Sequence, residues 1–140
     1  NKEKREIYLK VYNAEKIDIA KVGTCVGKIN KMIQGVLNGY SYRLKAAYKH
    51  FPISFYITND GKNVAIKNFI GQKKVRNFEM AGDAKLKLGS EKDTVVVFGT
   101  SLEDVSQSAA MIQNSFIPKK FDMRIFLDGI YIDRKENQMI

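Results

Sequence analysis

The spacing of hydrophobic residues changes along the first forty residues and predicts two different elements. Residues 7–12 are rich in strand-forming side chains, which favours a short strand. From residue 15 to residue 38 the apolar residues recur at helical spacing, so we expect an amphipathic helix that stops at Gly39. Cys25 is central in its apolar stripe, and we expect this stripe to be buried against a sheet that N-terminal residues missing here partly supply. The stripe contains Ile19, Val22, Cys25, Val26, Ile29, Met32, Ile33, Val36 and Leu37.

From Tyr40 onward, apolar and polar residues alternate, which is typical of strands. Residues 40–49 place tyrosines on one face and basic residues on the other. The tyrosines have two interpretations: they are core residues, or they form a platform for stacking RNA bases. Asp60 and Gly61 favour a hairpin turn between two further strands. We expect an antiparallel sheet built from strands at residues 40–48, 53–58, 63–69, 75–80, 85–88 and 94–98.

Residues 101–116 return to helical spacing and predict a second helix. Ser101 is a suitable N-cap residue, with Asp104 as its capping-box-like partner, and Pro118 follows the end of the helix. The apolar stripe of this helix consists of Leu102, Val105, Ala109, Ile112 and Phe116. A turn and a last short strand are expected within residues 122–133.

Both predicted helices contain the sequence Met-Ile-Gln, at residues 32–34 and 111–113, and both follow strands. A duplicated unit explains this pattern. We therefore expect an α+β fold of two similar repeats, each an antiparallel sheet packed on one helix. Residues 1–39 form the C-terminal part of the first repeat, which is incomplete at its N-terminus because only one strand precedes its helix. Residues 40–140 form the second repeat.

Basic residues outnumber acidic residues, and the excess is unevenly placed. The chain of 140 residues has a formal net charge of +9, and residues 1–70 alone hold +8 of it. Residues 61–78 contain no acid and five basic residues: Lys62, Lys67, Lys73, Lys74 and Arg76. Such a run beside Gly71 is suited to phosphate contacts, and its other interpretation is a solvated strand face. The charge indicates a polyanionic partner, either nucleic acid or an acidic membrane surface.

Residues able to support catalysis or metal binding are few. Cys25 and His50 are the only cysteine and histidine, which excludes a disulfide framework and zinc sites of the Cys-Cys-His-His type. No nucleophile with a base and no Walker loop can be assembled, and a KH clamp lacks its second glycine, since Lys74 stands there. We therefore expect that the protein is not an enzyme and that it binds no metal and no cofactor. With no signal peptide and no long apolar run, we expect a soluble protein in a reducing compartment.

Four segments together resemble one known family. They are residues 48–53, 68–73, 109–116 and the string Arg-Ile-Phe-Leu-Asp-Gly-Ile-Tyr at 124–131, which is the most specific of them. In this order they resemble the eukaryotic branch of the large-subunit ribosomal protein six family, over essentially the whole chain. The resemblance implies two α+β repeats, with roughly the first third of the full-length protein, which holds most strands of the first repeat, missing here.

The resemblance also implies a function. Family members bind large-subunit rRNA near the sarcin-ricin loop and the base of the factor-binding stalk, and have no enzymatic activity. It implies neighbouring large-subunit proteins and nearby translation factors as partners, no membrane, a cytoplasmic location in the ribosome and, in a eukaryote, assembly in the nucleolus. A free-standing basic adaptor that binds RNA or a membrane surface is the alternative function.

The expected RNA-binding residues combine the basic loop of the family with basic residues around it. They are Arg43, Lys45, Lys49, Lys67, Asn68, Gly71, Lys73, Lys74, Arg76, Lys119, Lys120 and Arg124. The sequence departs from the usual family pattern at Asn114, Pro118 and Phe121. In the C-terminal string we expect Phe126, Ile130 and Tyr131 to pin a tight turn, with Gly129 in a conformation that other residues resist.

Overall fold

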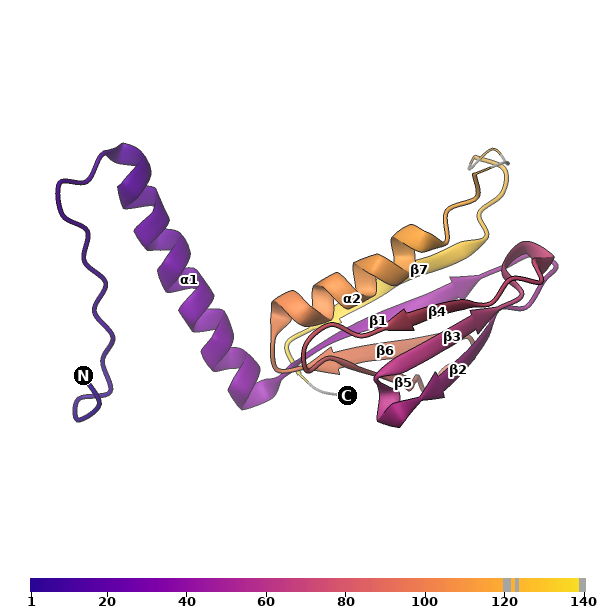
Figure 1. Cartoon of the computed structure of the whole chain (residues 1–140), viewed down its shortest axis with the longest axis horizontal. Helices are drawn as coiled ribbons and strands as arrows, with labels where there is room; N and C mark the ends of the chain where they lie inside the picture. The colour runs from indigo at the N-terminus through magenta and orange to yellow at the C-terminus, as the bar shows by residue number, and fades with distance from the viewer. Residues whose placement is uncertain (120–121, 123, 139–140) are drawn as a thin grey trace.

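The computed structural model describes residues 1–119, 122 and 124–138. Two helices and two antiparallel sheets confirm the predicted α+β class (Figure 1). The elements are α1 (Lys16–Asn38), β1 (Tyr40–Ala47), β2 (Ser54–Thr58), β3 (Asn63–Lys67), β4 (Arg76–Glu79), β5 (Lys85–Leu88), β6 (Thr94–Gly99), α2 (Leu102–Ser115) and β7 (Gly129–Glu136). The strands expected in one antiparallel sheet are divided between two: one sheet has the strand order β5-β6-β1-β7 and the other β2-β3-β4. Both sheets follow Gly39, and the division into repeats stays a prediction.

The predicted hairpin turn is confirmed between β2 and β3. Asp60 has a φ of 53° and Gly61 a φ of 90°, so both lie in the left-handed region that an Asp-Gly pair tolerates. A Cβ atom at Gly61 would also run into the backbone carbonyl of Leu86. Glycine is therefore required here both for its conformation and for the close approach of the turn to β5.

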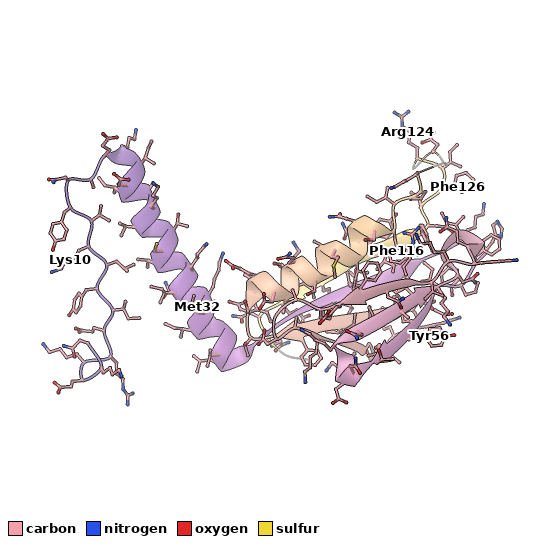
Figure 2. All side chains as sticks on the ribbon, in the orientation of Figure 1. Lys10, Met32, Tyr56, Phe116, Arg124 and Phe126 are labelled. Carbon is pink, nitrogen blue, oxygen red and sulfur yellow. The ribbon has the colours of Figure 1, made fainter. Side chains whose placement is uncertain are left out.

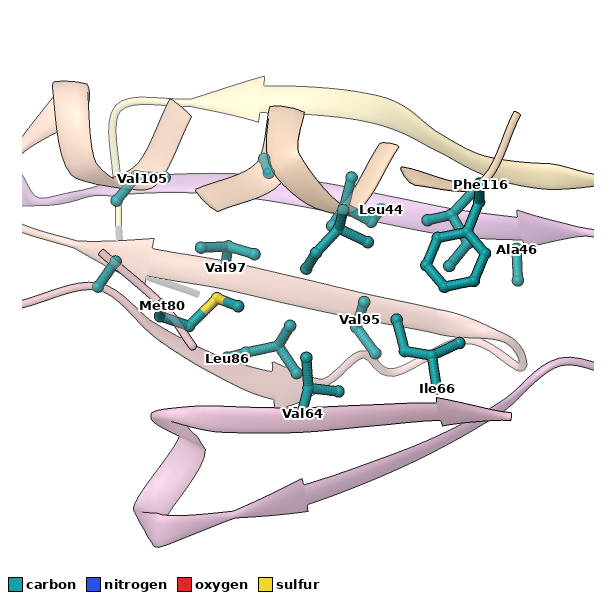
Figure 3. Close-up of a cluster of buried hydrophobic side chains, with 14 of the residues drawn as sticks. Leu44, Ala46, Val64, Ile66, Met80, Leu86, Val95, Val97, Val105 and Phe116 are labelled. Carbon is teal, nitrogen blue, oxygen red and sulfur yellow. The ribbon is translucent and has the colours of Figure 1, made fainter. Parts of the chain in front are cut away.

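A single core lies on one face of the four-stranded sheet. Helix α2 and the three-stranded sheet lie side by side and cover this face together, as Figures 1 and 3 show. Leu44 of β1 and Val97 of β6 are fully buried beneath them. Tyr40 is 6% exposed, which supports the core interpretation of the tyrosine face at that position. The buried side chains of the covering layer include Val64, Ile66, Val105, Ala109, Ile112 and Phe116.

The stripe of α2 is confirmed, but its expected cap is not. Ser101 occupies the N-cap position without a side-chain capping hydrogen bond. The carboxylate of Asp104, the expected partner, lies against Gly82 in the loop between β4 and β5. Contact with this loop replaces the predicted local capping pair.

The predicted burial of α1 and of Cys25 is wrong. Cys25 is exposed, and Ile19, Met32 and Val36 are each at least 64% exposed. The helix projects away from both sheets (Figure 1), and Ile7 and Leu9 line a hollow with Val22 and Ile29 on its apolar stripe. The C-terminal half of α1 contacts the rest of the fold. There the Tyr40 hydroxyl donates to the carbonyl of Lys31 at 3.0 Å. Helical periodicity establishes that a face is apolar, whereas burial also requires a partner, and neither sheet of the described structure reaches this face.

The strand predicted at residues 7–12 is also wrong: this segment is extended but unpaired. A strand is stabilised by hydrogen bonds to a neighbouring strand, and none of the strands described in residues 1–138 runs beside it. Strand propensity alone does not supply that neighbour.

The C-terminal string differs from expectation in two ways. Phe126 and Tyr131 are 43% and 44% exposed, and only Ile130 is buried as predicted. Gly129 lacks a positive φ. A Cβ at Gly129 would lie 3.0 Å from the carbonyl oxygen of Phe116, so this glycine serves the close approach of two segments.

We expect Phe116→Ala to lower the free energy of unfolding by about 3 to 5 kcal/mol, because its ring is buried among other aromatic rings. The ring lies edge-on to that of Phe69, with 5.0 Å between the ring centres, and its centre lies 5.8 Å from that of the Phe78 ring. Denaturant titration measures the change. The comparison is Phe126→Ala, because the Phe126 side chain is half-exposed. Equal losses for the two variants would show that Phe116 is not a central core residue.

Candidate nucleic-acid interface

Three loops meet at the end of the molecule opposite α1 (Figure 1). The strands β1 and β3 both end there, β4 and β7 begin there, and α2 ends there. The loops comprise residues 48–53, residues 68–75 and the described residues between α2 and β7 (116–119, 122 and 124–128). The topology therefore brings together two basic segments that lie more than forty residues apart in the sequence.

The loop after β3 is held in a defined conformation. Asn68, Ile70 and Gly71 have φ values of 66°, 52° and 69°, all in the left-handed region. The Asn68 amide donates to the carbonyl of Pro52 at 2.9 Å. A Cβ at Gly71 would lie 3.0 Å from the ring of Phe51. These contacts fix the loop against residues 51–52 and leave the side chains of the following residues exposed.

An open hollow of about 750 Å³ lies between this loop and the end of α2. Lys74 and Arg76 line it from one side and Lys119 from the other. Gln72 and Asn77 also line it. They were not among the predicted RNA-binding residues, because an uncharged polar side chain does not stand out in a basic sequence. The walls combine cations and amides, which are hydrogen-bond donors suited to phosphate oxygens.

Arg76 differs from its basic neighbours because its guanidinium is used within the fold. It donates to the carbonyl of Ser115 at the end of α2 and, at 3.1 Å, to the side-chain oxygen of Gln72. It also lies over the rings of Phe69 and Phe116, at 5.2 and 4.8 Å from their centres. Arg76 therefore joins β4 to α2 and closes the floor of the hollow.

A second hollow, of about 510 Å³, adjoins the first, and Ile70 borders both. Lys49, His50 and Phe51 line one side and residues 125–128 the other. Arg124 is exposed beside it at the tip of the C-terminal loop, as Figure 2 shows, and its backbone N–H donates to the Asp122 carboxylate at 2.9 Å.

The remaining predicted residues lie elsewhere. Lys67 is on the three-stranded sheet with its ammonium 4.6 Å from the ring centre of Tyr56. Arg43 is paired with Glu91 at 3.6 Å, and its side chain is 14% exposed. Lys45 is exposed on β1. Lys120 and Phe121 lie outside the described residues.

The charges at this end are poorly neutralised. None of the three ion pairs in the described part of the chain involves Lys73, Lys74, Lys119 or Arg124. The nearby Asp93 carboxylate accepts the Tyr48 hydroxyl at 2.7 Å, and this hydrogen bond raises the pKa of Tyr48. Tyr48 therefore stays neutral at physiological pH and does not offset the basic side chains.

The described residues contain no group of three or more His, Cys, Asp or Glu side chains placed to hold a metal ion. Over the same residues, neither helix is both long and apolar enough to cross a membrane.

Fold and surface together define a basic α+β protein with an electropositive end. Comparison with known proteins identifies its family. The family model for ribosomal protein L6 matches residues 51–129. Large ribosomal subunit protein uL6 of Tetrahymena thermophila is 35% identical over 134 residues, which cover 95% of this chain and 71% of that protein. The uL6 of Methanothrix thermoacetophila is 39% identical, covering 96% and 74%, and uL6B of Saccharomyces cerevisiae is 38% identical, covering 92% and 69%. The chain belongs to the ribosomal protein L6 family.

We expect Arg76→Gln to lower the free energy of unfolding by about 1.5 to 3 kcal/mol, because hydrogen bonds from a charged donor to Ser115 and Gln72 are lost. Lys74→Gln, in the same hollow but exposed, is the matched control and should leave the unfolding midpoint unchanged. Both are measured by denaturant titration of the free protein. If Arg76→Gln were as stable as Lys74→Gln, the assignment of Arg76 to the fold would be incorrect.

Proposed function

We propose that this chain is a structural constituent of the large ribosomal subunit that binds rRNA through the end formed by its three loops. Membership in a family of ribosomal proteins supports this, and it confirms the expectation that the chain is not an enzyme. The observation that carries the proposal is a group of exposed cations at this end that have no ion-pair partner among the described residues. Lys74 and Lys119 line the first hollow, Lys73 precedes Lys74 in the loop after β3, and Arg124 lies beside the second hollow.

Binding at this end works mainly through charge. Each lysine or arginine that meets a phosphate releases condensed counterions, so affinity falls steeply with salt and depends little on base sequence. The exposed backbone at Gly71 lets a sugar-phosphate chain approach the loop closely. The loop is already held by Asn68 and Phe51, so the cations at the hollow are presented on a fixed surface.

The proposal extends to the surroundings that the family resemblance implies. These are rRNA near the sarcin-ricin loop and the stalk base, neighbouring large-subunit proteins, and translation factors that bind close by. The proposed location is the cytoplasmic ribosome, with nucleolar assembly in a eukaryotic cell. Within the predicted RNA-binding set, Lys49, Asn68, Gly71, Lys73, Lys74, Lys119 and Arg124 lie at this end, while Arg43, Lys45 and Lys67 reach RNA from the sheets.

Sedimentation of cell extracts tests the function directly. We expect the protein to remain with the large subunit after a high-salt wash, because a constituent of the particle is held by many simultaneous contacts. Recovery only in the light fractions would instead support the free-standing adaptor, and binding to acidic vesicles in those fractions would identify its membrane form.

A triple variant tests the lysines that line the first hollow together with Lys73 beside them in the loop after β3. We expect Lys73→Gln, Lys74→Gln and Lys119→Gln together to lower the slope of log K against log salt by about 2 to 3 for a large-subunit rRNA transcript, since each lost phosphate contact removes about 0.9. The control replaces three exposed lysines near the other end, Lys10, Lys16 and Lys21, by Gln. An unchanged slope in the first variant would place these lysines in solvent.

A further inference from the structure

A second basic surface lies on the four-stranded sheet, on the face opposite the core. We call it the outer face. Side chains alternate along a strand, so the register assigns them to one face or the other. The outer face carries Arg43 and Lys45 of β1, Lys85 and Lys87 of β5, Val96 and Phe98 of β6, and Tyr131 and Arg134 of β7.

The register aligns three cations in one row across the sheet. Lys87 pairs with Val96, Val96 with Arg43, and Arg43 with Arg134. Arg43 and Arg134 are thus direct cross-strand neighbours of like charge, an arrangement that destabilises a sheet when no anion separates the two charges. Glu91 pairs with Arg43 and partly compensates, while Lys87 and Arg134 at the two ends of the row are exposed.

The apolar residues of β6 on this face are largely covered, whereas Tyr131 of β7 is 44% exposed. Val96 is 2% exposed, and the ammonium of Lys87 lies 5.3 Å from the ring centre of Phe98. The hydroxyl of Tyr131 donates to the carbonyl of Leu127 at 2.9 Å. The surface therefore offers mainly charged groups to a partner, and Tyr131 is its one exposed ring among the described residues.

The charges form a two-dimensional array. Neighbouring strands lie about 4.8 Å apart, and residues on the same face of a strand about 6.8 Å apart. The cations come from three strands, β5, β1 and β7, and so spread across the width of the four-stranded sheet. Three acids lie near the array: Glu91 pairs with Arg43, Glu136 ends β7, and Asp133, next to Arg134, is the extra residue where the pairing of β1 with β7 shifts. Lys45, close to the end of β1, connects the array with the loop end of the molecule.

We propose that the outer face is a second phosphate-contacting surface that binds the backbone of RNA independently of base sequence, with Lys85, Lys87 and Arg134 as its new contact residues. This rests on the proposed rRNA-binding function and adds a contact to it. A row of repelling cations is stabilised by an anion placed over it, and a nucleic-acid backbone supplies anions repeatedly along its length. The chemistry is charge neutralisation, and no base-specific contact is implied.

The test uses the full chain and a large-subunit rRNA transcript. We expect the variant Lys85→Gln, Lys87→Gln and Arg134→Gln to bind about 100-fold or more weakly at 0.1 M salt, with the salt slope lower by about 2 to 3. The thermal midpoint should not fall, because all three side chains are exposed and Arg134→Gln removes the repulsion between Arg134 and Arg43. The pair Lys85→Gln and Lys87→Gln on β5 provides a second variant if the triple variant unfolds, with a slope lower by about 2.

The outcomes separate this inference from the function on which it rests. If the unchanged protein binds the transcript and the outer-face variants bind equally well, the inference is overturned and the proposed function stands. If the unchanged protein fails to bind, both are overturned. The control with Lys10, Lys16 and Lys21 replaced by Gln has the same net charge as the triple variant, so equal weakening by that control would also overturn the inference. A last outcome concerns poly-glutamate. If it bound the unchanged protein but not the triple variant, while both bound RNA equally well, the outer face would be a site for acidic protein and the inference would be overturned.

Discussion

The pairing of β1 with strands on both of its sides is the constraint on which the rest of the fold depends. β1 pairs with β6 along one edge and with β7, from the far end of the chain, along the other. This central position fixes which side chains face the core, because shifting a strand by one residue would exchange its two faces. It also sends the loops after β1 and before β7 to the same end, where the candidate interface forms.

Arg76 shows how the core and the interface share residues. Its guanidinium is a cation within a basic hollow, yet its donors bond to Ser115 and Gln72 and its plane lies over two rings. A planar group with several fixed donors fulfils both roles, whereas lysine would not. The hollow thus has a rigid floor made from the fold and exposed cations at its margin, an arrangement that keeps stability and binding largely in separate side chains.

The sequence predicted those elements correctly whose apolar faces are buried in the fold. Strand boundaries between Tyr40 and Gly99 and the stripe of α2 follow directly from periodicity, since both faces of these elements have their expected surroundings. Cys25 and the segment at residues 7–12 could not be predicted in this way, because their burial or pairing depends on a partner that local spacing does not reveal. The basic loop was identified from its charge, but the internal role of Arg76 depends on Ser115, thirty-nine residues away. The row formed by Lys87, Arg43 and Arg134 was equally hidden, because the shift in pairing near Arg43 decides which residue of β7 meets it.

The left-handed backbone of the loop after β3 has a consequence for the entropy of association. Ile70 is β-branched and adopts a φ of 52°, a conformation that is unfavourable for such a residue, and the buried ring of Phe69 beside it helps to hold it there. The conformational freedom of this segment is therefore lost when the protein folds. A ligand arriving at the loop meets a surface that has little freedom left to lose, so more of the energy of each phosphate contact is retained as affinity.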